Sequence, residues 1–194
     1  MRRIFLRDYG RGQDLTTDEA KDARLLARDD LERRSGLSFS AADFERAAHL
    51  YALLYLEKYS QLNPVYTATF LAQAQAHLGL KLEGLFQPSG GPMVGIIGRF
   101  EQYGTLTGPI VGYDTALPQN LGLYRRLRAI NHGHARENRW LYNMSAGAED
   151  FKSRRGGAPT VEYMIADFRR ASRTQRLGAW SLQATLNAAA SRLF

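Results

Sequence analysis

The segment Pro118-Gln119-Asn120-Leu121-Gly122-Leu123-Tyr124 links an apolar, strand-like run to the longest helix-like run of the chain. Its surroundings, from Thr105 to Phe168, are predicted to form a strand, a glycine-containing loop, a basic helix, a strand, a short helix and a strand. The long helix is predicted to start at Leu121. A helix start leaves backbone N–H groups unpaired and presents the positive end of the helix dipole, so this loop is a natural binding place for phosphate.

The composition is that of one globular domain with a basic surface. The chain has 194 residues, is 44% hydrophobic and 23% charged, and carries a net charge of +7 with a pI near 9.9. This charge favours polyanionic partners such as nucleic acid or a phosphorylated cofactor, although no RNA-recognition, zinc-finger or basic-zipper motif accompanies it. The absence of cysteine excludes disulfides, zinc–thiolate sites and cysteine nucleophiles. No apolar run is long enough to cross a membrane and the N-terminus lacks a secretory pattern, so we expect no membrane partner and a cytoplasmic location.

The N-terminal half is predicted to be helical. Residues 1–36 form a charged extension whose single helix is expected over Thr17–Arg34, followed by one domain over 37–194. Ser40-Ala41-Ala42-Asp43 fits a capping box and opens a helix that should run to about Tyr59. A further helix is expected to restart at Asn63-Pro64 and to stop at Gly79, with its apolar residues facing inward, namely Phe70, Leu71 and Ala74.

The second half alternates between strands and helices. Three strands joined by short turns are expected to form an antiparallel meander, over Leu80–Gly84, Met93–Phe100 and Thr105–Tyr113. The long helix should run to Arg139 with a buried stripe of Leu123, Leu127 and Ile130. The remaining elements are expected to be a strand over Trp140–Met144 parallel to the third strand, a helix over Ala146–Arg155, a strand over Thr160–Phe168 and a helix over Leu177–Leu193.

This order of elements resembles the GNAT acyltransferase core, and two motifs lie at matching places. Gln119-x-x-Gly122 matches the pyrophosphate-loop signature of that family up to its last position, where this chain has Tyr124. The segment Asn143 to Gly156 resembles the family's Asn, Ala, aromatic and Gly pattern after its fifth strand. The resemblance implies an α/β (α+β) fold with a mixed, mostly antiparallel central sheet, helices on both faces, and a cleft where two strands splay apart.

A subgroup of these folds is closer still. Phe151-Lys152 followed by Arg155-Gly156, and Glu57-Lys58-Tyr59-Ser60-x-Leu62-Asn63-Pro64, are similar to the Fem-type (peptidoglycan aminoacyltransferase-like) subgroup, whose members join amino acids or acyl groups to amines. The family resemblance implies an acyl-coenzyme A co-substrate, and no Asp/Glu/His set in the sequence indicates a metal site. The resemblance places the coenzyme against one set of residues, namely Gln119, Asn120, Leu121, Gly122, Leu123, Tyr124, Arg125, Asn143 and Lys152.

Two residues depart from the family pattern at important positions. Tyr124 stands where a small residue normally lets the backbone approach the pyrophosphate. This implies that coenzyme A binds in a changed pose or does not bind. Phe151 stands where many members carry a tyrosine that protonates the departing thiolate, and phenylalanine has no proton to donate.

Acyl transfer to an amine needs a polarised carbonyl, a base and close positioning of both reactants. We nominate Glu101 and Asp114 as bases, because they close the second and third strands near the expected cleft, and Tyr142 as a fallback proton donor. The alternatives are solvated carboxylates and a core tyrosine. His132-Gly133-His134 is not expected to bind a metal, because residues two apart on a helix point away from each other.

Three arginines of the long helix have two interpretations. Arg125, Arg126 and Arg128 follow the loop and could contact a 3′-phosphate or a tRNA backbone, or they could solubilise the helix.

Three functions therefore remain open. The leading one is an N-acyltransferase that uses acyl-coenzyme A and acts on a small amine or amino acid. The second is a Fem-like transferase that uses aminoacyl-tRNA, and the third is a catalytically silent binding module of the same fold. A homo-oligomer is compatible with each of them.

Overall fold

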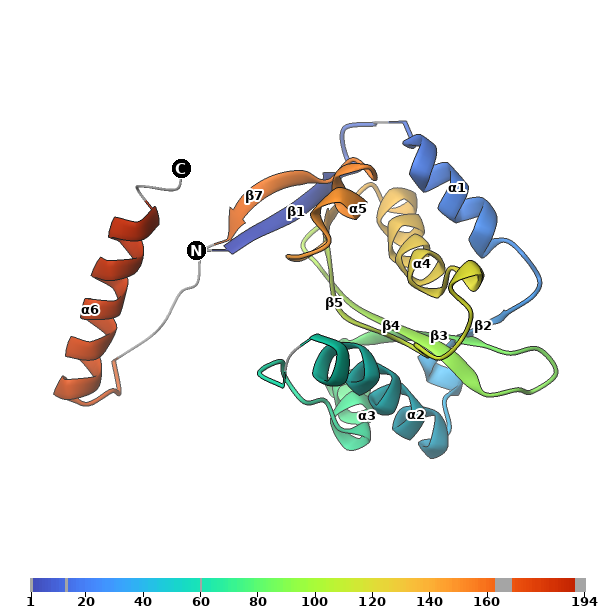
Figure 1. Cartoon of the computed structure of the whole chain (residues 1–194), viewed down its shortest axis with the longest axis horizontal. Helices are drawn as coiled ribbons and strands as arrows, with labels where there is room; N and C mark the ends of the chain where they lie inside the picture. The colour runs from blue at the N-terminus through green and yellow to red at the C-terminus, as the bar shows by residue number, and fades with distance from the viewer. Residues whose placement is uncertain (1, 13, 60, 163–168, 191–194) are drawn as a thin grey trace.

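The computed structural model describes residues 2–12, 14–59, 61–162 and 169–190 (Figure 1). Its centre is a seven-stranded sheet in the order β2-β3-β4-β5-β6-β1-β7. The strands are β1 (Arg2–Asp8), β2 (Glu32–Ser35), β3 (Lys81–Phe86), β4 (Met93–Gln102), β5 (Thr105–Tyr113), β6 (Leu141–Asn143) and β7 (Ala158–Glu162). Among these strands, β5 and β6 pair in parallel and all other neighbours are antiparallel. The mixed, mostly antiparallel sheet and the β3–β4–β5 meander are as predicted.

Helices cover both faces of the sheet, which confirms the predicted layers. On one face lie α2 (Ala41–Ala52), a π-helical segment (Leu53–Tyr59) and α3 (Ala68–His77). On the other face α1 (Thr17–Leu26) packs on α4 (Leu123–Glu137), which itself lies on β4 and β5 (Figure 1). The chain also contains the short helix α5 (Glu149–Ser153) and the C-terminal helix α6 (Arg173–Ala190).

Each face has its own apolar core. The first comprises buried residues of α2 and α3 against β3, β4 and β5, among them Leu50, Leu71 and Ile96. The second lies under α4 and contains the stripe that the sequence predicted, namely Leu123, Leu127 and Ile130. The 3.6-residue period therefore identified the buried side of α4 correctly.

The N-terminal segment differs most from its prediction. A single helix over 17–34 is wrong: α1 ends at Leu26, and residues 32–35 form edge strand β2 instead. Arg2–Asp8, for which no strand was expected, forms β1 between β6 and β7. Buried strands need cross-strand partners that local sequence does not reveal. The division into an extension over 1–36 and a domain over 37–194 stays a prediction, and this pairing speaks against an independent extension.

Several element boundaries also shift. The capping box of Ser40 and Asp43 and the helical end at Tyr59 are confirmed, although the segment after Ala52 is π-helical. The next helix starts with Thr67 as its cap rather than with Asn63, whose side chain instead donates to the Tyr55 carbonyl. Phe70 of this helix is 42% exposed, so its inward orientation was wrong.

The C-terminal part confirms the type of each element within the described residues. The strand expected over 160–168 is β7, over 158–162, and residues 163–168 lie outside the described range. Helix α6 leaves Leu177, Trp180 and Leu182 exposed to solvent. None of the helices in the described ranges combines the length and apolar character needed to cross a bilayer.

Candidate functional site

Strands β5 and β6 part from each other in the middle of the sheet. They pair from Thr105 with Leu141 to Thr107 with Asn143, whereas β5 continues to Tyr113. After Asn143 the chain follows β1: the Met144 N–H donates to the Phe5 carbonyl at 2.9 Å. Since β5 stays with β4 and the other strand stays with β1, the strands separate from Gly108 onward. This is the splayed pair that the resemblance implied.

Helix α4 begins beside this split, and its N-terminus has no side-chain cap. Gln119–Leu121 forms a turn of 3-10 helix, and Gly122 follows with a φ of +61° and no side-chain cap on the helix. Gln119 and Asn120 are exposed. The first N–H groups of a helix have no intrahelical acceptor, so those at the start of α4 can donate to an anion.

Aromatic side chains crowd the same helix start. The ring of Tyr124 packs against Phe151 of α5, with centroids 4.8 Å apart, and lies 6.3 Å from the ring of Tyr113 on β5. The two departures from the family pattern, Tyr124 and Phe151, are therefore in contact. Their rings occupy space that a small residue would leave for the backbone to approach a phosphate.

A polar cluster lies at the apex of the split. Arg128 Nη1 donates to the Tyr142 hydroxyl at 3.1 Å, and Arg128 Nε donates to the Tyr124 hydroxyl at 3.2 Å. Gly108, the first β5 residue beyond the β6 pairing, lies against this cluster: a Cβ there would approach Asn131 Nδ2 to 2.7 Å and the Tyr142 hydroxyl to 3.4 Å. Both side-chain polar atoms of Asn131 are buried without a hydrogen-bond partner in the described part of the chain. Two strands and one helix thus direct polar groups to one point.

The guanidinium of Arg128 remains charged in this position. Burial opposes the charge, but the oxygens of Tyr142, Tyr124 and Tyr55 outweigh that effect and raise the pKa of Arg128 above its ordinary value. The site therefore holds a permanent positive charge among phenol groups.

The three nominated catalytic residues do not come together. Tyr142 lies in the cluster at the split. Glu101 pairs across the sheet with Leu106 at the start of β5, whereas Asp114 follows the end of β5. Eight residues along a strand span about 26 Å, so the two carboxylates cannot serve one reacting centre.

The surroundings of both carboxylates are those of structural ion pairs. Glu101 accepts hydrogen bonds from Lys81 and Arg99. Burial by itself would raise the pKa of Glu101, but these bonds outweigh it and lower the pKa, which weakens the carboxylate as a base. Asp114 forms an ion pair with Arg46 of α2 at 2.7 Å.

Two residues that were predicted to bind coenzyme A form hydrogen bonds with backbone groups of this protein instead. Lys152 is 1% exposed, and its Nζ donates to the carbonyls of Ser145 and Ala146. Asn143 Oδ1 accepts from the Ser145 N–H at 2.8 Å. Both side chains fix the turn after β6, which guides the chain away from β5. For Lys152 this placement contradicts a direct contact with coenzyme A, because the ammonium group is enclosed.

The helix arginines divide into different roles. Arg125 is half-buried and donates to Asp22 of α1 at 2.6 Å, and Arg155 donates to the other oxygen of Asp22. Arg126 is buried and makes a bidentate contact with Asp30. Arg126 therefore does not solubilise the helix, and the neighbouring carboxylate compensates for its burial.

A second polar cluster, which the sequence did not reveal, joins β1, α1 and α4. Arg7 forms a buried ion pair with Glu19 at 3.1 Å, and the Tyr9 hydroxyl lies 2.6 Å from both Glu19 Oε1 and His132 Nδ1. Burial would raise the pKa of Glu19, but hydrogen bonds from His132, Tyr9 and the Thr16 N–H outweigh it and lower the pKa to about 2. Burial lowers the pKa of His132, which favours the neutral ring.

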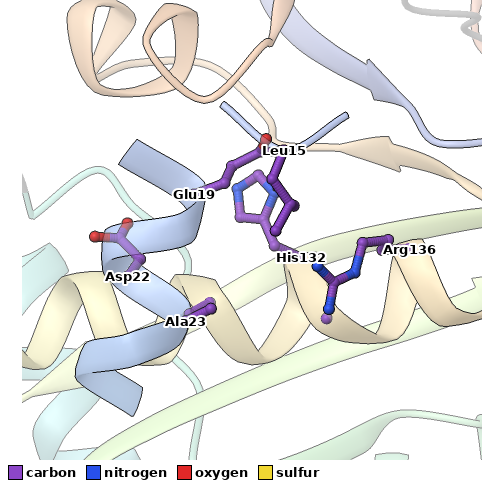
Figure 2. A pocket seen from close by; sticks show the side chains of 8 residues that line it. Leu15, Glu19, Asp22, Ala23, His132 and Arg136 are labelled. Atoms are coloured by element: carbon purple, nitrogen blue, oxygen red, sulfur yellow. The ribbon is translucent and has the colours of Figure 1, made fainter. Parts of the chain in front are cut away.

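A small cavity adjoins this second cluster (Figure 2). It lies between α1 and α4, has a volume of about 30 Å³, and is lined by Leu15, Glu19, His132 and Arg136 among others. This volume admits a single water molecule but no substrate. The cavity lies on the α1 side of α4, and the ring of His132 in its lining packs edge-to-face on Tyr142, with centroids 4.9 Å apart. His134 points elsewhere and binds Glu83.

The residues at the split carried a sequence signal that the prediction missed. Tyr124, Arg128 and Asn131 recur at i, i+4 and i+7, which places them on one side of α4 beside the apolar stripe. A polar stripe next to a buried one indicates a buried polar group. The sequence did not indicate which strand this stripe would face.

Comparison with known proteins identifies the fold. No protein-family model matches the chain, and no curated protein matches it significantly in sequence. Solved structures do match: FemX has a TM-score of 0.62 and 5% sequence identity, and the match covers 81% of this chain and 59% of FemX. L-PGS from Bacillus licheniformis has a TM-score of 0.58 and 12% identity, with 81% of this chain and 57% of L-PGS covered. A Trypanosoma brucei acetyltransferase has a TM-score of 0.52 and 17% identity, with 71% of this chain and 99% of that protein covered. The chain thus has a GNAT-like fold with similarity to FemX, as its motifs predicted, and it spans less than two thirds of the FemX and L-PGS chains.

Proposed function

We propose that this protein is an acyltransferase that moves an acyl group from acyl-coenzyme A to the amine of a small molecule or amino acid, at the split between β5 and β6. The observation that supports this most directly is the separation of β5 from β6 beyond Thr107, beside the uncapped start of α4. The likeness to the Trypanosoma brucei acetyltransferase agrees with this activity but rests on fold alone.

The split offers the groups that the chemistry requires. Beyond Thr107, β5 has backbone N–H groups on the side facing away from β4, and such groups can stabilise the oxyanion that forms when the amine attacks the thioester carbonyl. The start of α4 would bind the pyrophosphate through its first N–H groups. The Tyr142 hydroxyl, which a Cβ at Gly108 would approach to 3.4 Å, is our candidate for proton transfer. The ion pairs of Glu101 and Asp114 argue against them as bases.

The test compares donors that differ only in the nucleotide. Acetyl-coenzyme A should raise the melting temperature of the full chain by several degrees and support acetylation of amines, whereas acetyl-pantetheine, which lacks the pyrophosphate, should have a much smaller effect. Tyr124→Ala should increase the affinity for acetyl-coenzyme A, because it removes the ring from the helix start. A full panel of acyl-coenzyme A species without any thermal shift or turnover would refute the proposal.

A second candidate function is transfer from an aminoacyl-tRNA, as the Fem-type resemblance implies. The rings of Tyr124 and Phe151 at the helix start favour an aminoacyl-tRNA donor, because they occupy space that a coenzyme A pyrophosphate would need. The net charge of +7 suits an RNA partner. Salt-dependent retention of tRNA that weakens with Arg125→Ala, but not with the exposed control Lys21→Ala, would support this function. If neither donor binds, the chain is a catalytically silent module of this fold.

A further inference from the structure

Five arginines are buried within the described part of the chain, and four of them face a carboxylate. The pairs are Arg7 with Glu19, Arg99 with Glu83, Arg126 with Asp30, and Arg155 with Asp22. A buried guanidinium is costly unless an anion compensates for its charge, so this pairing is the expected solution.

Arg128 is the exception. It is 4% exposed, yet within the described residues its hydrogen-bond partners are the neutral hydroxyls of Tyr124 and Tyr142, and no carboxylate forms an ion pair with it. Within the described residues, the fold thus buries a positive charge at the apex of the β5–β6 split that faces no carboxylate, unlike the charges of the other four arginines. A bound anion would supply the partner that the other four receive from carboxylates.

The surrounding groups are all suited to donate to an anion. Each tyrosine oxygen accepts a hydrogen bond from Arg128, which leaves the hydroxyl proton of Tyr124 and of Tyr142 available for a further acceptor. The buried amide of Asn131, beside Gly108, has no partner within the described structure for either of its polar atoms. A guanidinium, two hydroxyls and an amide group therefore converge at one enclosed point.

We propose that Arg128 and Tyr124 bind the carboxylate of the acceptor substrate, so that the amine acylated at the split belongs to an amino acid or a similar carboxylate-bearing amine. This inference rests on the proposed acyl transfer and adds the class of acceptor to it. A carboxylate fits because it is planar and carries one negative charge against one guanidinium. A phosphate monoester carries up to two negative charges, for which the one guanidinium of Arg128 is a poorer match.

The first measurement needs no acyl donor. The melting temperature of the full chain is compared in sodium acetate, sodium phosphate and sodium chloride at equal ionic strength, for the wild type, Arg128→Met and Arg7→Met. Acetate should stabilise the wild type by a few degrees over chloride. Arg128→Met should melt at the same or a higher temperature in chloride, because it removes a buried charge that no described carboxylate faces, and it should show no effect of acetate.

Arg7→Met is the matched control. It removes a buried arginine and leaves Glu19 without that guanidinium, so it should lower the melting temperature. Because Arg128 is unchanged in this variant, the acetate effect should remain. The inference is overturned if acetate and chloride act alike on the wild type, if Arg128→Met keeps the acetate effect, or if phosphate stabilises and acetate does not. The last result would assign Arg128 to a phosphate group of the donor. Tyr124→Phe, which removes one donor and keeps the ring, should weaken the acetate effect and serves if Arg128→Met does not fold.

The second measurement concerns turnover with acetyl-coenzyme A. The acceptors compared are free amino acids and the corresponding amino-acid carboxamides. Arg128→Met should raise the KM for the amino acids more than tenfold and change the KM for the carboxamides by no more than about twofold. An equal loss of kcat for both would place Arg128 at the reacting carbonyl and overturn the acceptor class. If the wild type turns over neither, the proposed function fails, and the acetate measurement still decides whether Arg128 binds a carboxylate.

Discussion

The side chain of Leu25 in α1 lies against Gly122 at the start of α4: a Cβ at position 122 would come within 2.6 Å of Leu25 Cδ2. Gly122 also has a φ of +61°, a conformation that costs other residues roughly 1 kcal/mol. One glycine therefore permits both the turn into α4 and the close approach of α1. The loop that resembles a pyrophosphate loop is also a packing contact of the N-terminal helix.

We expect Gly122→Ala to lower the free energy of unfolding by roughly 1–3 kcal/mol, from the left-handed backbone and the contact with Leu25 together. Gly133→Ala in the same helix is the control, because a Cβ added there would have no atom within 4 Å, and it should stabilise by up to about 1 kcal/mol. Urea denaturation of both variants provides the measurement. Equal effects at the two positions would show that the Leu25 contact is unimportant.

Acid should destabilise the fold through Glu19 and His132. The pKa of Glu19 is lowered to about 2 from an ordinary 4.5, so its contribution is complete above about pH 4.5 and is lost as the pH falls towards 2, on the order of 3 kcal/mol in all. The lowered pKa of His132 adds to this loss below about pH 6.5, where the unfolded chain takes up a proton that the buried ring resists.

Unfolding free energies of wild type and Glu19→Gln between pH 7.5 and pH 3 measure this effect. The variant should be less stable at neutral pH and should lose much of the dependence on pH below 4.5. Glu45→Gln, at an exposed position, should behave as the wild type. A wild-type stability that stays constant from pH 5 to pH 3 would contradict the role of Glu19.

Lys152 should act on stability rather than on donor binding. Lys152→Met removes the donor to the carbonyls of Ser145 and Ala146, and we expect it to lower the free energy of unfolding by roughly 1–3 kcal/mol. The apparent Kd for acetyl-coenzyme A, measured well below the melting temperature, should change little. A large loss of affinity for acetyl-coenzyme A with unchanged stability would show that Lys152 contacts the coenzyme.

Glu101→Gln and Asp114→Asn should leave kcat within about threefold of the wild type, since both carboxylates are held in ion pairs far from each other. Tyr142→Phe should reduce kcat much more, because it removes the hydroxyl at the apex of the split. Rates measured under saturating donor and acceptor separate these cases. A hundredfold loss of kcat in either carboxylate variant would indicate that this carboxylate is the base after all.

Local patterns predicted some features correctly because those features are local. The capping box at Ser40, the apolar stripe of α4 and the meander of three short-linked strands each depend on contacts within or between adjacent elements. Boundaries failed where a distant partner decides them, as in β2, whose residues Glu32–Ser35 pair with β3 some fifty residues later.

The sequence by itself determined the order of elements from α2 onward, the β3–β4–β5 meander and the loop that opens α4, because period, glycine placement and turn residues act over a few positions. The tertiary structure alone decided which charges are compensated. Arg126 and Arg128 are two residues apart on one helix, and both are buried. The first lies beside Asp30, whereas the second lies among tyrosines where β5 leaves β6. Long-range packing sets such neighbours, and in a low-dielectric interior the neighbour decides whether an arginine stabilises the fold or is left to bind a ligand.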